Sequence, residues 1–251
     1  MKKKAILIAL SVVFSLTAAA NGRAGGPRDD AEASWAARED LSKAMEAVSA
    51  YGSLLKENPR EYESLVRLSR LHYWIGQNLE EKDPKEALSH YGKGREYGRT
   101  AAETAPDRPG GYFFEGANLA RENSLKGTFT NLFGIRTVKK LNEKAASIQA
   151  GYFHGGPDRF FCAYYTRLPG LLGGNVSKAI EHGRKAVDSH PAYAGNRVFL
   201  AEAYHKDGND ELARRELETA LLIPDDALAD SIPEQRLEKK RAAALLKKIT
   251  R

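Results

Sequence analysis

The chain has little of what enzymes use for covalent and metal chemistry. Its 251 residues include a single cysteine, so an internal disulfide cannot form. The Gly-x-Ser-x-Gly nucleophile elbow and the His-Glu-x-x-His zinc motif are both missing from the sequence. Glu202 and His205 stand three residues apart, a spacing that some metal sites use, but such sites need companion ligands from other helices. We therefore expect no catalytic residues, no metal and no cofactor.

The single cysteine, Cys162, lies in the apolar and aromatic run Phe-Phe-Cys-Ala-Tyr-Tyr. A nucleophile or an intermolecular bridge is the alternative, but no signature of a catalytic cysteine flanks it. In such surroundings a free cysteine behaves as a small hydrophobic residue. We expect it to be buried.

Strand patterns, phosphate-binding loops and a strong charge bias are also missing. No segment alternates apolar and polar residues for long enough to predict a sheet. Gly173-Gly174 is followed by Asn-Val-Ser, whereas a phosphate-binding loop ends in Gly-Lys-Ser/Thr. The formal charge of +6 falls to +3 once Lys2, Lys3 and Lys4 are removed with a leader. This bias is too weak to predict a nucleic-acid partner, which requires a clustered basic face.

Residues 1–24 have the layout of a secretory signal peptide. Three lysines precede an apolar segment at 5–16, and the small residues at 18–20 suit cleavage before Asn21, with a second candidate site after Ala24. The alternative is an uncleaved membrane anchor, but the apolar run is short for a span of about 20 residues. No cysteine stands near the cleavage site, which argues against a bacterial lipoprotein. We expect a periplasmic protein with no transmembrane span after cleavage.

Residues 25–251 read as one all-α domain. Apolar side chains recur near every 3.6 residues, and proline or glycine separates successive segments. Asp83-Pro84 predicts a helix start, because aspartate caps the first turn and proline fits within it. The longer insertion at 126–140 mixes Phe and Leu with Gly and Thr, and we expect it to be a loop. The expected helices span residues 40–56, 62–77, 83–105, 110–124 and 138–152.

The most regular repeat covers residues 192–224. It lies between Pro191 and Pro224, which are separated by close to the roughly 34-residue tetratricopeptide period. Its alanines allow two antiparallel helices to approach closely, and Leu217 and Tyr204 fill the space beside them. Earlier units are longer, so the pattern predicts an irregular tetratricopeptide-like solenoid of helical hairpins.

The C-terminal segment, about 233–250, is a basic amphipathic helix with Leu237, Leu245 and Ile249 on its apolar side. A helix on the membrane surface is the alternative, but that would need a larger apolar face. We expect a capping helix that is polar outside and apolar inside.

Two turns rich in glycine and proline flank an aromatic helical segment in the middle of the chain. Gly-Gly-Pro at 155–157 predicts the end of one segment and the start of a helix. Leu-Pro-Gly-Leu-Leu-Gly-Gly at 168–174 predicts a tight, left-handed connection, after which Asn175 caps the helix 176–189. The turn residues are Gly155, Gly156, Pro157, Pro169, Gly173 and Gly174.

The order of these motifs resembles the T-component family of TRAP transporters. The resemblance covers about residues 112–224 and consists of GGP-x-R, an aromatic helix, LPG-x-x-GG, a further helix and a tetratricopeptide unit. It implies a periplasmic, tetratricopeptide-like protein associated with tripartite solute uptake. The implied partner is an extracytoplasmic solute-binding protein, and a small solute is a second candidate ligand. Homo-oligomerisation stays open.

Aromatic and guanidinium groups are concentrated beside these turns. Many of the aromatic residues must be core, but residues 160 and 164 share one side of a helix and 161 and 165 another, so they cannot all face inward. We expect some to line a concave groove that meets a solute or a partner's ligand opening, with arginine available to bind carboxylates. The alternative is that the aromatics are pure core and Arg159 a surface charge. The candidate binding residues are Tyr112, Arg159, Tyr164, Tyr165 and Arg197.

Two function classes follow. The first is a non-enzymatic accessory protein of a TRAP-type uptake system that binds a solute-binding protein. The second is a generic tetratricopeptide scaffold for envelope protein assembly, with no role in solute binding. A neighbouring gene for a TRAP binding protein or permease would favour the first.

Overall fold

The computed structural model describes residues 26–250, except the side chains of 128–133. The described residues contain no strand, and the chain is all-α as expected. The helices are α1 (Pro27–Ala36), α2 (Leu41–Glu57), α3 (Tyr62–Leu79), α4 (Pro84–Thr104), α5 (Pro109–Lys126), α6 (Thr128–Ile148), α7 (Tyr152–Arg167), α8 (Val176–Ser189), α9 (Ala194–Lys206), α10 (Asp210–Leu222) and α11 (Ile232–Ile249), with short 3₁₀ turns η1 (Gly170–Leu172), η2 (Asp225–Ala227) and η3 (Ala229–Ser231).

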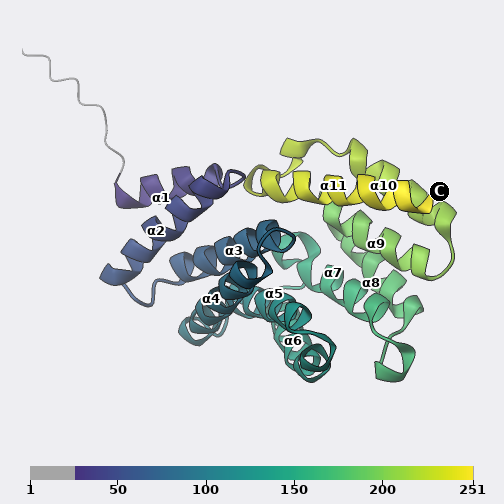
Figure 1. The fold of residues 1–251 in the computed structure, drawn as a ribbon, viewed down its shortest axis with the longest axis horizontal. Helices are drawn as coiled ribbons and strands as arrows, with labels where there is room; N and C mark the ends of the chain where they lie inside the picture. Colours follow the sequence, from purple (N-terminus) through teal and green to yellow (C-terminus); the bar gives the residue numbers. More distant parts are fainter. Residues whose placement is uncertain (1–25, 251) are drawn as a thin grey trace, which may run out of the picture.

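Successive helices pack as hairpins, and the hairpins stack along a curve. Each helix contacts the next one in sequence, and from α3 onward each odd-numbered helix also contacts the next odd-numbered helix. This is the layered arrangement of a helical-repeat solenoid. Figure 1 shows the helices following an arc from α1 to α11, with the start of α11 returning to the junction of α1 and α2.

The leader expected at residues 1–24 lies outside the described residues. Within residues 26–250, no helix combines the length and the apolar character needed to cross a bilayer.

Helix starts follow the capping signals in the sequence. The Asp83 carboxylate accepts a hydrogen bond from the Glu86 N–H at 2.9 Å, and Pro84 occupies the first turn of α4. The Asn175 side chain accepts from the Lys178 N–H at 2.9 Å at the start of α8. These bonds satisfy N–H groups that have no partner within the first turn.

Two segments differ from the expectation. Residues 126–140 are not a loop, because α6 begins at Thr128. A Cβ at Gly134 would overlap the Asn123 side chain, so the glycine lets α6 lie close against α5, and this packing overrides the weak local helix preference. The second difference is α1 (Pro27–Ala36), which precedes the first helix expected from the sequence, at residues 40–56. Burial of Ala31 and Trp35 against α2 and α3 stabilises it.

The repeat at 192–224 contains the hairpin of α9 and α10. Ala203, Ala213 and Ala220 are completely buried. Ala213 and Ala220 pack with Leu217 in a core that continues to α11, whereas Ala203 packs with Cys162 and Ala179 of α7 and α8. The small side chains allow close helix approach, as the spacing of the alanines predicts.

α11 is not simply polar outside and apolar inside. Its first two turns bury the polar residues Glu234, Gln235 and Glu238. The Gln235 amide donates to the Ala192 carbonyl at 2.7 Å and accepts from the Ala194 N–H at 2.8 Å, so it holds the start of α9. Buried polar groups with such partners fix the position of α11 on the repeat.

The start of α11 also closes the arc onto the N-terminal helices. Glu234 accepts hydrogen bonds from Arg38 at 2.6 Å and from Arg70 at 2.8 and 3.0 Å, and all three side chains are buried. Both guanidinium groups also lie over the Trp35 ring, at 4.1 and 4.8 Å from its centre. This cluster, here called the clasp, joins residues almost 200 positions apart in the sequence.

Candidate binding surface

α7 buries one side of its surface and leaves the neighbouring side half-exposed. Gly156, Arg159, Cys162 and Thr166 recur at three- and four-residue intervals and are buried. The aromatic residues of α7 fall between these positions, and the helical repeat therefore directs them away from the buried side.

Five rings form a continuous, half-buried patch, which we call the aromatic surface. The Phe160 and Phe161 ring centres are 5.1 Å apart and edge-on, as are those of Tyr164 and Tyr165. The His182 ring of α8 stacks on Tyr165 at 5.8 Å. Partly exposed aromatic clusters of this kind are typical of protein contact sites. The aromatic surface consists of Phe160, Phe161, Tyr164, Tyr165 and His182.

Charged neighbours fix the orientation of these rings. The His182 Nδ1 atom lies 2.7 Å from the Asp158 carboxylate, so the imidazole is tied to α7. The Lys178 ammonium lies 5.7 Å from the centre of the Tyr165 ring, within the range of a cation–π contact. His182 and Tyr165 are therefore held in place by neighbouring charged groups.

The turn that follows α7 projects two leucines into solvent. Leu171 is 101% exposed and Leu172 47% exposed, while the backbone beneath them is tightly bonded. The Gly174 N–H donates to the Pro169 carbonyl at 3.0 Å, and the Asn175 N–H donates to the Tyr165 carbonyl at 3.0 Å. The turn thus presents an apolar tip anchored to the end of α7.

The two glycines of this turn have different roles. Gly173 adopts φ +96°, the left-handed region that the sequence predicted for this connection. Gly174 does not have a positive φ, but a Cβ there would overlap the Leu168 carbonyl oxygen. A substitution at Gly174 is therefore blocked by close approach of the backbone, and left-handed geometry is not the reason.

The Gly-Gly-Pro turn produces a kink in which helical geometry begins only after Gly155. Phe153, His154 and Gly155 all have positive φ, at 48°, 56° and 76°. A Cβ at Gly156 would lie 2.6 Å from the Phe113 ring, and Pro157 then stands in the first regular turn. The boundary predicted at the Gly-Gly-Pro turn is therefore present, because regular helical geometry starts at Gly156.

Arg159 is buried at this kink and is not a surface charge. Its guanidinium donates to the carbonyls of Phe153 and His154, at 3.3 and 3.0 Å, and to the Asn196 side chain at 2.8 Å. It also lies 4.6 Å from the centre of the Tyr193 ring. Its donors therefore satisfy carbonyl groups that the left-handed backbone leaves without helical partners.

The structure does not gather all the predicted binding residues. Tyr164 and Tyr165 lie together on the aromatic surface. Tyr112 packs on the aromatic core of α5, with Lys144 5.8 Å from its ring centre. Arg197 forms an ion pair with Glu216 of α10 at 2.7 Å. Tyr112, Arg159 and Arg197 thus contact separate sets of partners.

Sequence reasoning missed His182 and the leucines of the turn. The only signal for Leu171 and Leu172 was the presence of two large apolar residues inside a turn of glycine and proline. Nothing in the sequence placed His182 on the aromatic surface, because its contact with Tyr165 depends on how α8 packs on α7.

Cys162, Glu202 and His205, the candidates for catalysis or metal binding, contact other protein groups. Cys162 is fully buried, its Sγ donates to the Phe199 carbonyl at 3.2 Å, and burial raises the pKa of the thiol to about 12. A thiol of that pKa is not a nucleophile at neutral pH. Glu202 pairs with Arg167, and His205 pairs with Asp210. Within the described residues, no group of three or more His, Cys, Asp or Glu side chains is placed to hold a metal ion.

The chain is similar to several known proteins. A thermophilic TPR protein from Thermus thermophilus is 19% identical in sequence and superposes with a TM-score of 0.62. The match covers 88% of this chain and 99% of that one, which shows a common fold. MamA aligns with a TM-score of 0.41 at 16% identity, over 78% of this chain and 93% of its own. No curated protein sequence matches. A family model described as the TRAP transporter T-component matches residues 123–251. The chain therefore belongs to the TRAP transporter T-component family.

Proposed function

We propose that the protein is a non-enzymatic, periplasmic accessory component of a TRAP-type uptake system, and that it binds the solute-binding protein of that system through the aromatic surface and the adjoining leucine turn. Family membership supports the transport role, and the leader-like residues 1–24 support export. The observation that carries the binding role is the patch of five half-buried rings next to two exposed leucines.

The physical basis is burial of apolar area on a rigid support. Leu171 and Leu172 lose most of their exposed apolar area when a partner covers them, and such burial is the main favourable term in protein association. Tyrosines are enriched among the residues that dominate interface energies. His182 is tied to Asp158 and packs on Phe161 and Tyr165, so these rings lose little side-chain entropy on binding.

The candidate residues then have different roles. Tyr164 and Tyr165 contact the partner, and their hydroxyl groups meet a solute held at the partner's opening. Arg159 is a positioning residue, because its guanidinium is occupied by internal acceptors. Tyr112 and Arg197 lie on α5 and α9, outside this contact.

The test is a pair of matched leucine variants. Leu171 and Leu222 are both largely exposed, at 101% and 82%, but only Leu171 adjoins the aromatic surface. We expect Leu171→Ala and Tyr164→Ala each to weaken binding to the purified solute-binding protein of the same TRAP system about tenfold or more. Leu222→Ala should leave the Kd, measured by isothermal titration calorimetry, unchanged. Equal affinities in all variants, or a wild type that does not bind, would overturn the proposal.

A further inference from the structure

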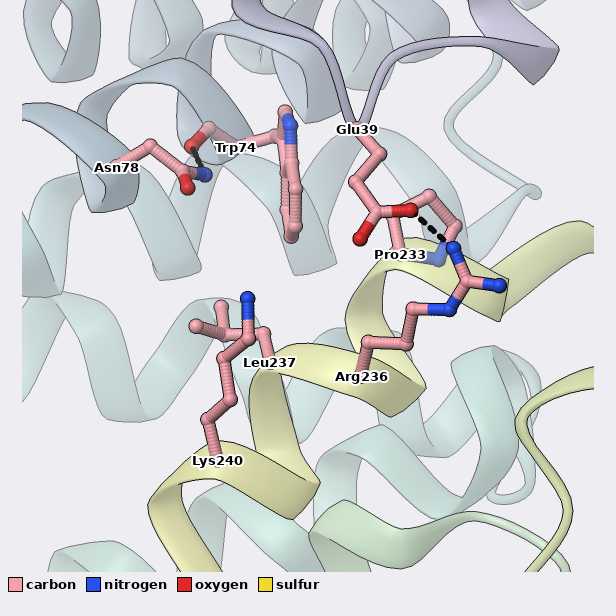
Figure 2. Close-up of a pocket in the computed structure, with 7 residues that line it drawn as sticks. All are labelled: Glu39, Trp74, Asn78, Pro233, Arg236, Leu237 and Lys240. Carbon is pink, nitrogen blue, oxygen red and sulfur yellow. Dashed lines mark hydrogen bonds and ion pairs between the residues drawn. The ribbon is translucent and has the colours of Figure 1, made fainter. Parts of the chain in front are cut away.

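A small cavity lies beside the clasp, where α11 crosses α3 and the start of α2. Its volume is about 70 Å³. Figure 2 shows the side chains of α3 and α11 facing each other across it, with the Glu39 and Arg236 ion pair at one end. The lining residues are Glu39, Trp74, Asn78, Pro233, Arg236, Leu237 and Lys240.

Part of the cavity wall is apolar and fixed, whereas Glu39, Asn78, Arg236 and Lys240 line the rest. The Trp74 indole forms one wall, and its N–H donates to the Arg38 carbonyl at 2.7 Å, which sets the ring orientation. Leu237 and Pro233 of α11 form the opposite side. A short aliphatic chain placed here exchanges water for contact with the ring and the leucine.

The charges around the cavity favour an anion. Glu39 and Arg236 neutralise each other, and Arg236 is also bonded to Asp225 at 3.0 Å. Lys240 has no hydrogen bond or ion pair with any group that the structure describes within residues 26–250, and Figure 2 shows its ammonium pointing into the cavity.

We infer that this cavity binds a short-chain aliphatic carboxylate, with the carboxylate on the Lys240 ammonium and the chain between Trp74 and Leu237. A volume of 70 Å³ is about that of two water molecules in the liquid, so the enclosed part of the ligand has roughly two to four heavy atoms. Trp74 and Leu237 favour an ion with an aliphatic chain over phosphate or sulfate, because neither of those ions has an apolar part to place against them. The site is separate from the aromatic surface of α7 and α8, and its test does not depend on the partner proposed above.

Butyrate is the probe, and the tryptophans report its binding. The chain has two tryptophans, Trp35 and Trp74, so a ¹⁵N-labelled protein gives two indole N–H signals. Trp35→Phe identifies them, and assignment by backbone spectra replaces that variant if it does not fold. We expect butyrate to shift the Trp74 signal saturably, with a Kd in the micromolar to millimolar range that suits so small a ligand. Butyramide, the neutral analogue, should cause no saturable shift.

The control variant is on the same helix. Lys247 is an exposed lysine in the last turn of α11 and does not line the cavity. We expect Lys240→Ala to raise the Kd for butyrate at least tenfold and Lys247→Ala to leave it unchanged. The inference is wrong if butyrate leaves the Trp74 signal unmoved, if butyramide binds equally well, or if Lys240→Ala binds butyrate as wild type does.

Discussion

At the residue scale, Arg159 was expected to bind a ligand but stabilises the backbone at the start of α7. The sequence singled it out as a carboxylate-binding arginine beside a family-like turn. In the fold it is 8% exposed, and its acceptors are the Phe153 and His154 carbonyls and the Asn196 side chain. The sequence could not reveal this, because the acceptors come from a left-handed backbone segment and from α9.

Removing this guanidinium should destabilise the protein strongly. Arg159→Ala removes a donor from the Phe153 carbonyl and from the Asn196 side-chain oxygen, while the His154 carbonyl keeps the Asn196 N–H at 3.1 Å. We expect a loss of about 3 kcal/mol of unfolding free energy. Urea denaturation followed by circular dichroism measures this loss. Arg167→Ala is the control on the same helix, since Arg167 is 55% exposed and pairs with Glu202 at the surface. It should cost less than about 1 kcal/mol. Equal midpoints for the two variants would contradict the assigned role.

The two adjacent glycines of the LPG turn should respond differently to asparagine. Asparagine tolerates left-handed backbone better than most residues, and the space around Gly173 is open, so Gly173→Asn should lower the melting temperature less than the same change at Gly174. Gly174→Asn places a Cβ against the Leu168 carbonyl oxygen and must shift the backbone, so it should lower the melting temperature by several degrees. Thermal unfolding of the two variants beside wild type tests this. If both melt alike, close approach at Gly174 is not the constraint.

At the element scale, the helices bounded by capping residues and prolines were predictable. α4 begins and ends within a residue of the boundaries set by Asp83-Pro84 and Ala105-Pro106. α6 was only partly predicted, because Gly134 and its threonine-rich surroundings resemble a loop locally and are helical only against α5. Local sequence therefore predicts helix starts and stops well. It cannot show which weak segments neighbouring helices stabilise.

The α3–α4 hairpin contains a buried histidine pair that should make stability depend on pH. The Nδ1 atoms of His72 and His90 are 2.8 Å apart, and burial, followed by the charge of His90, lowers the pKa of His72 to about 3. The unfolded chain takes up this proton near pH 6.5, whereas the folded one does so only near 3. Stability from His72 is therefore complete above about pH 6.5 and is lost as the pH falls from there toward 3, by about 2 kcal/mol at pH 5.

A variant comparison isolates this effect. Burial raises the pKa of Glu115 to about 7, and this carboxyl group opposes the trend, because its contribution is lost as the pH rises from 4.5 through 7. The measurement is therefore the difference between wild type and His72→Gln in urea titrations at about pH 7.5 and pH 5. Wild type should lose about 2 kcal/mol more than the variant. Identical pH dependence in both proteins would show that His72 does not titrate as described.

At the scale of the whole molecule, the sequence predicted a solenoid but not its closure. A repeat pattern describes contacts between neighbouring units, whereas the clasp joins Arg38 and Arg70 to Glu234 across almost the full chain. Each of these residues, taken alone in the sequence, resembles an ordinary surface charge. The same closure creates the cavity between α3 and α11, which no local pattern could indicate.

The clasp should therefore control both stability and shape. Burial alone would raise the pKa of Glu234, but Arg70 and Arg38 hold it below its usual range, so the carboxylate is charged at neutral pH. Glu234→Ala leaves two buried guanidinium groups without a counter-charge, which should cost about 3–5 kcal/mol of unfolding free energy. Because the same contact holds the ends of the arc together, the variant should also show a larger radius of gyration by small-angle X-ray scattering.

Glu218→Ala provides the matched control, since Glu218 pairs with Arg214 on the exposed side of α10 and joins no distant elements. It should leave the scattering curve unchanged and cost less than about 1 kcal/mol. If Glu234→Ala loses stability but keeps the wild-type radius, the interlocking of α11 with α9 through Gln235 is enough to maintain the arc. In that case the clasp stabilises the closed shape without determining it. Wild-type stability in Glu234→Ala would contradict the burial of the ion pair itself.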